Sequence, residues 1–174
     1  MAAPTEADLR AIFALRPAAA IEYLERKGFA ITWNWHDVDA ATHGRALTVA
    51  RAARLDVLQD IRDALVENLE RGATLRDFKR NLRPTLEAKG WWGRQVVVAP
   101  DGGAEVAQLG SPRRLDTIYQ TNMQSAYMAG RYAAAYEARE THPYWMYVAV
   151  MDGVTRPSHA ALHGKVFRWD DPIW

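Results

Sequence analysis

Apolar residues recur every three or four positions along most of the chain, a spacing that predicts amphipathic helices. A helix-start signal at Thr5 opens the first such pattern, which Pro17 interrupts and Gly28 ends. A longer periodic stretch begins near Asp37 and continues to Gly72. We therefore expect the N-terminal part of the chain to be helical.

Two further helices have recognisable start signals. Thr74 and Asp77 form a capping-like pair ahead of one helix, which Pro84 is expected to end or restart. Ser111, followed by a proline at the first helical position, starts the other helix, whose apolar and alanine pattern extends to Arg139. The alanines favour close packing of this helix against another element.

Strand signals appear at two places. Residues 95–99 and 104–109 flank the sequence Pro100-Asp101-Gly102-Gly103, which is typical of a β-hairpin turn. The apolar run Tyr144–Met151 is expected to form a strand buried on both faces, with a helical turn at 158–163 and a return strand at 165–169.

Together these elements predict a predominantly helical α+β fold, with a small hairpin near 95–109 and a small C-terminal β-unit near 144–169. We expect a helical N-terminal part over 1–93 and a mixed C-terminal part over 94–174. The hairpin region is the predicted boundary between them.

Composition limits the chemistry that the chain can perform. Its 174 residues include no cysteine, which excludes disulfides, a thiol nucleophile and thiolate metal sites. Lysine and arginine total 22 against 21 acidic residues, so no global positive field favours nucleic acid. No apolar run approaches the roughly 18 residues of a membrane span. We expect neither a cofactor nor a metal, and no membrane association.

His159 and His163 are the strongest candidates for catalysis. Their spacing of four places them on one face of a helical turn, with Arg156 nearby. A metal-independent nuclease or toxin-like domain could use the histidines as acid and base and the arginine for phosphate charge. In the favoured structural alternative, Asp152 caps the turn, Arg156 pairs with a nearby carboxylate and the histidines bind loop carbonyls.

Asn122 lies on the apolar stripe of the long helix and is interpreted as a packing or register residue. Trp91 and Trp92 stand between basic residues, but core or subunit-interface packing is favoured over base stacking. Arg113 and Arg114 are interpreted as part of a solvated helix face, with portal or DNA contact as the alternative. Arg131 either reaches a partner or phosphate or pairs with Glu137 or Asp116. A weak DNA contact stays open as an alternative for these basic positions.

Several stretches together resemble the phage Mu F-like head morphogenesis family, whose members are minor head proteins. The resemblance is strongest at Gly110-Ser111-Pro112-Arg113-Arg114-Leu115 and over 152–174, which contains Asp152, Thr155, Arg156, His159 and His163. It implies that 94–174 is a head-morphogenesis core and that these five residues, with Asn122, form a structural motif without catalytic residues.

The resemblance also implies a role and a location. The role is in prohead assembly near the portal, through protein–protein contacts with portal and capsid proteins, with assistance to DNA delivery as a further expectation. The protein is expected to be oligomeric in the virion, in the head interior or at the portal vertex, and to occur in the host cytoplasm during assembly. The partner-binding candidates are Arg113, Arg114, Trp91, Trp92 and Arg131.

The sequence departs from the family pattern at its C-terminal end. Some relatives carry cysteines in this region, whereas Arg156 and His159 occupy the corresponding positions here, so no zinc site is expected. The family pattern would continue beyond Trp174, and a truncated protein is therefore expected.

Overall fold

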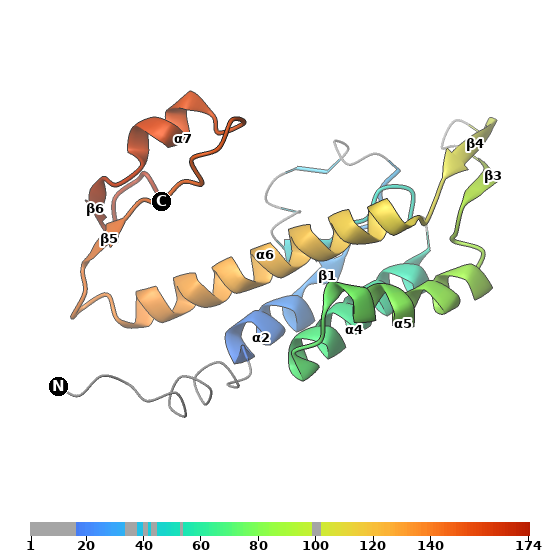
Figure 1. Ribbon diagram of the computed structural model, residues 1–174, viewed down its shortest axis with the longest axis horizontal. Helices are drawn as coiled ribbons and strands as arrows, with labels where there is room; N and C mark the ends of the chain where they lie inside the picture. Colours follow the sequence, from blue (N-terminus) through green and yellow to red (C-terminus); the bar gives the residue numbers. More distant parts are fainter. Residues whose placement is uncertain (1–16, 34–37, 40–41, 43–44, 53, 99–101) are drawn as a thin grey trace. The chain divides into compact units, whose positions relative to one another are not determined.

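The computed structural model describes residues 17–33, 38, 39, 42, 45–52, 54–98 and 102–174, so the helix predicted to begin at Thr5 starts outside the described residues. The fold is a predominantly helical α+β fold, as the sequence predicted (Figure 1). In chain order the elements are α2 (Ala18–Arg26), β1 (Gly28–Phe29), β2 (Ala46–Leu47), α4 (Leu55–Arg71), α5 (Leu75–Ala88), β3 (Arg94–Val98), β4 (Ala104–Gln108), α6 (Pro112–Glu137), β5 (Tyr144–Met146), α7 (Pro157–Leu162) and β6 (Val166–Arg168).

Two compact units divide the chain, the first ending at Gly130 and the second comprising Arg131–Trp174. The predicted boundary after residue 93, between a helical part and a mixed part of the chain, stays a prediction. The structure groups the β3–β4 hairpin and most of α6 with the preceding helices, because Ala107, Leu109 and Leu115 belong to the same apolar core as those helices.

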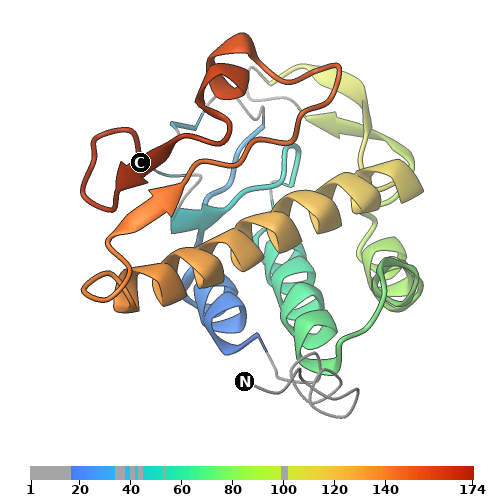
Figure 2. The ribbon, with the colours of Figure 1, turned by 60° about the vertical axis from the view of Figure 1, so that its left-hand side comes forward.

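The core of the first unit lies between its helices. Leu58, Ile61 and Leu65 of α4 and Phe78 and Leu86 of α5 are almost completely buried. Burial of side chains of this size contributes roughly 1.5–3 kcal/mol each. In Figure 2, α6 runs across α2 and α4 and closes this core.

The helix predicted from near Asp37 to Gly72 has its start outside the described residues, and its continuity is wrong, since Ala46 and Leu47 form β2 and α4 begins at Leu55. Leu47 lies in β2, which pairs in parallel with β1 and aligns Phe29 with Leu47. This strand pair joins segments distant in sequence, which local periodicity does not report. The C-terminal end of α4 agrees with the prediction, because Gly72 adopts the left-handed conformation there (φ 58°).

A buried amide and a capping box join three helices of the first unit. Thr74 and Asp77 cap α5 reciprocally, which confirms the predicted pair. The Asn68 side chain of α4 donates to the Thr74 carbonyl (3.1 Å) and accepts from the Tyr119 hydroxyl of α6 (2.9 Å). The prediction that Pro84 ends or restarts the helix is wrong. Helix α5 continues through Pro84, and its apolar face extends to the fully buried Leu86.

The β3–β4 hairpin is antiparallel and confirms the predicted one. At its open end the chain passes close to two tryptophans. The Gly110 amide donates to the Trp91 carbonyl (3.2 Å), and the Gly93 amide donates to the Gly110 carbonyl (2.9 Å). A β-carbon at position 110 would lie 2.4 Å from the Trp92 ring, so only glycine fits there.

The second unit contains the antiparallel pair β5–β6 and the short helix α7, near the predicted elements. The prediction of a strand buried on both faces is wrong, because Tyr144, Met146, Val148 and Val150 are all more than half exposed. Among the described residues, every fully buried hydrophobic side chain lies at or before Ala126. This unit is therefore held together by partly buried aromatic contacts rather than by a closed core.

Within the described part of the chain, no helix has the length and apolar character that crossing a membrane requires.

Gly110→Ala is expected to lower the free energy of unfolding by roughly 1–3 kcal/mol, because the added methyl group overlaps the Trp92 ring and the Trp91 carbonyl. Gly153→Ala is the control, since nothing lies within 4 Å of its β-carbon position. Urea unfolding followed by tryptophan fluorescence measures both variants, and equal stability of the two would contradict the close approach at Gly110.

Thr74→Ala is expected to lower the free energy of unfolding by about 1 kcal/mol at neutral pH, because it removes the cap of α5. The Thr74 hydrogen bonds also hold the pKa of Asp77 below its ordinary value. A lowered carboxyl pKa stabilises the fold above the unfolded-state pKa, and this stabilisation is lost as pH falls through the folded-state pKa.

The stability deficit of Thr74→Ala should therefore shrink as pH falls below about 4. Urea unfolding at several pH values measures this change, and Thr85→Ala, at an exposed site of the same helix, is the control. A deficit that stays constant with pH would show that the pKa of Asp77 does not depend on Thr74.

Candidate functional site

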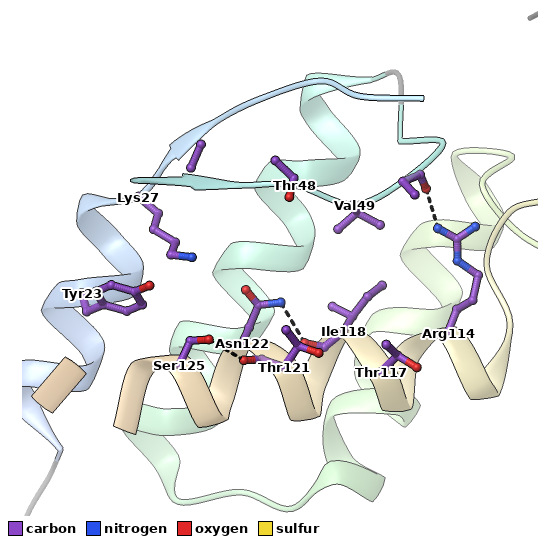
Figure 3. A pocket seen from close by; sticks show the side chains of 12 residues that line it. Tyr23, Lys27, Thr48, Val49, Arg114, Thr117, Ile118, Thr121, Asn122 and Ser125 are labelled. Carbon is purple, nitrogen blue, oxygen red and sulfur yellow. Dashed lines mark hydrogen bonds between the residues drawn. The ribbon is translucent and has the colours of Figure 1, made fainter. Parts of the chain in front are cut away.

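The principal cavity of the first unit, which we call the α6 pocket, has a volume of about 610 Å³. The floor is α6, β2 with the residues that follow it forms the wall across from α6, and α2 closes one end (Figure 3). This volume lies within the range of sites that receive a small molecule or several side chains of a partner.

The floor of the α6 pocket is one face of a single helix. Its lining side chains are spaced at three or four residues, as one helical face requires, and comprise Arg114, Thr117, Ile118, Thr121, Asn122 and Ser125. Three of them donate to carbonyls one turn earlier in α6: Thr117 to Arg113 (3.2 Å), Asn122 to Ile118 (2.8 Å) and Ser125 to Thr121 (2.8 Å). Most of the side-chain hydrogen-bond donors on the floor are therefore already bound to carbonyls of α6 itself.

Arg114 lies at one end of the pocket. Its guanidinium donates to the Gln108 carbonyl (2.7 Å) and the Ala50 carbonyl (2.5 Å), and it stacks on the Trp91 ring at 5.0 Å. Burial lowers the pKa of Arg114, and the nearby charge of Arg51 lowers it further. Among the described residues no carboxylate pairs with Arg114, so its charge is solvated by neutral dipoles.

Lys27 brings a second positive charge to the pocket. It is a largely buried residue at the end of α2, and its ammonium projects into the pocket in Figure 3. The same ammonium lies 4.9 Å from the centre of the Tyr23 ring, a cation–π contact. Neither aspartate nor glutamate is among the described residues that line the pocket.

The five partner-binding candidates divide between surface and interior. Arg113 and Arg131 are exposed on α6. Trp91 is only 3% exposed, and its indole donates to the Arg51 carbonyl (3.0 Å). Trp92 is partly buried beneath the Arg83 guanidinium. The structure thus leaves Arg113 and Arg131 as the accessible members, whereas Trp91 and Arg114 contribute to packing.

Residues of the predicted C-terminal motif lie in the second unit. Asp152 closes a turn by accepting the Val154 amide (3.0 Å), and its carboxylate lies 2.8 Å from the Thr155 hydroxyl. These hydrogen bonds hold the pKa of Asp152 below its ordinary value, the Thr155 hydroxyl being the main cause. Asp170 pairs with Arg168 (3.1 Å), and among the described residues Arg156 has no ion-pair partner.

Both candidate histidines use their Nδ1 atom in a local hydrogen bond. His159 Nδ1 lies 2.5 Å from the Tyr147 hydroxyl, and the Ala149 amide donates to His163 Nδ1 (3.2 Å). Arg156 and His159 line a second pocket of about 370 Å³, and His163 is not among its lining residues. Across the described positions, no three His, Asp or Glu side chains gather as a metal site would require.

Sequence reasoning identified Arg114 and Asn122 but missed the other residues that line the α6 pocket. Thr117, Thr121 and Ser125 recur every four residues on α6, a stripe of hydroxyls that could have indicated a polar face. Tyr23 and Lys27 carry no such signal, because they meet α6 only through tertiary packing.

Comparisons with known proteins connect this chain to one family. Residues 59–174 match the family described as Phage Mu protein F like protein. The chain is 49% identical over 167 residues to the putative capsid assembly protein F of Escherichia phage Mu. The aligned region covers 96% of this chain and 38% of that protein. It is also 49% identical over 144 residues to the Mu-like prophage FluMu F protein of Haemophilus influenzae, covering 83% of this chain and 34% of that protein.

No solved structure matches the chain. The chain spans less than half the length of the two curated relatives. The family match covers well over half of the chain, from within α4 to the last residue. This chain therefore belongs to the family of phage Mu protein F like proteins.

Proposed function

We propose that this chain takes part in the assembly of a phage or prophage capsid. The observation that carries the proposal is the 49% identity, over 96% of the chain, to a protein named putative capsid assembly protein F. The expected location is the virion, in the head interior or at the portal vertex, and the host cytoplasm during assembly.

The proposed mechanism is contact with portal and capsid proteins rather than catalysis. Exposed arginines favour such contacts, since Arg113 and Arg131 project from α6 into solvent. The second unit adds an apolar strip of alternating residues, Tyr144, Met146, Val148 and Val150, all exposed. Apolar surface of this kind is typical of protein–protein interfaces, which agrees with an oligomeric state in the virion.

The hydrogen bonds of the two histidines support a structural role for them. His159 and His163 direct Nδ1 toward Tyr147 and the Ala149 amide, so each ring is oriented by the surrounding loop. The net charge of +1 gives the chain no global positive field to attract DNA, which supports protein contacts over DNA binding. Assistance to DNA delivery is part of the proposal only through such contacts.

Binding to the cognate portal protein tests the proposal. Arg113→Glu and Arg131→Glu should each weaken co-purification with co-expressed portal by about tenfold, because each reverses an exposed charge at the contact. Size-exclusion chromatography with light scattering measures the complex. Arg76→Glu is the control, since Arg76 is exposed on α5 and undergoes the same charge change.

Absence of a complex between the wild-type chain and portal would contradict the portal contact. An equal effect of all three reversals would show that net charge, rather than a defined surface of α6, determines binding.

A further inference from the structure

We propose that the α6 pocket receives a carboxylate-bearing apolar segment of another protein in the assembling particle. The inference rests on the proposed function for the identity of the partner, and on the pocket itself for its chemistry.

The charges around the α6 pocket favour an anionic occupant. Arg114 is a charged residue of the lining, and none of the described lining residues is a carboxylate. Arg114 binds two carbonyls and a tryptophan ring, which fix the guanidinium without neutralising it. Arg51 lies near Arg114 but is itself paired with Glu105 (3.9 Å), so Arg114 is the cation that an anionic group would contact. A carboxylate at this end would therefore gain a charge-assisted contact.

The floor of the pocket favours an occupant with apolar side chains. The hydroxyl and amide donors of Thr117, Asn122 and Ser125 already bind carbonyls of α6. What remains toward the pocket is largely methyl and methylene surface, together with Ile118, Val49 and Ala46 from the floor and the β2 wall. Figure 3 shows the Asn122 oxygen directed into the cavity, where it can accept a donor from the occupant.

Size and shape favour a protein segment. The floor extends from Arg114 to Ser125, about 16 Å along the helix axis at 1.5 Å per residue. An elongated groove of this kind suits a short helix or peptide that places several apolar side chains along α6 and a carboxylate near Arg114.

The absence of cysteine from the chain makes a direct measurement of the pocket charge simple. Thr121→Cys places a single thiol in the pocket, and Gln120→Cys places one on α6 outside it. Each full-length variant is modified with an anionic and a cationic methanethiosulfonate reagent, sulfonatoethyl and trimethylammonioethyl. The ratio of anionic to cationic rates should be roughly fivefold higher at Thr121→Cys, because local cations attract the anionic reagent.

Protection of the Thr121→Cys thiol identifies the occupant. The probes are overlapping synthetic peptides that cover the cognate portal and major capsid proteins, with a single-stranded oligonucleotide as the nucleic-acid arm. At least one peptide should slow modification at Thr121→Cys by more than about tenfold without slowing it at Gln120→Cys, and replacing its Asp or Glu by Asn or Gln should remove the effect.

Three results would overturn the proposal: equal rate ratios at the two thiols, protection by the oligonucleotide alone, or protection by no peptide. The proposed function is judged separately by co-purification of the wild-type chain with portal. A chain that binds portal while no peptide protects Thr121→Cys would retain the assembly role and lose the pocket contact.

Discussion

The first unit depends on how the partly buried guanidinium of Arg114 is satisfied. Arg114 joins the start of α6 to the end of β4 through Gln108 and to the chain after β2 through Ala50, while its planar face lies against Trp91. Burying a charge without such partners costs several kcal/mol, so these segments must assemble around Arg114 together. Trp91 continues the connection by donating to the Arg51 carbonyl. The walls of the α6 pocket are positioned by the same contacts.

The second unit is stabilised by contacts between aromatic rings rather than by a buried core. Its rings contact one another in a chain, with Trp145 and Tyr147 each within 6 Å of the Trp174 ring. None of its described side chains is fully buried, and a two-stranded sheet of this size is only marginally stable alone. Cysteine is absent from the whole chain, so disulfides do not compensate. The strip from Tyr144 to Val150 therefore leaves apolar side chains exposed, a kind of surface that is typical of protein–protein interfaces.

Local chemistry made some elements predictable from the sequence. Thr74 and Asp77 cap α5 through hydrogen bonds between residues three apart, so the sequence alone predicts the cap. The glycines after Pro100 allow a tight turn, so the sequence also predicts the hairpin. The break before α4 could not be predicted, because Leu47 fits a helical period yet pairs with Phe29 in a strand. The run from Tyr144 was read as doubly buried because composition alone does not show that its alternate side chains face solvent.

The pocket was harder to predict because adjacent residues in a helix point in different directions. Arg113 and Arg114 read as one basic pair in the sequence, but successive positions are rotated by about 100°. Arg113 therefore reaches solvent, whereas Arg114 turns inward to a carbonyl that lies 64 residues earlier in the chain. That inward turn stabilises the fold and leaves a charge without a carboxylate at the end of a largely apolar groove. A single long-range interaction thus both builds the pocket and sets the charge of the occupant that it favours.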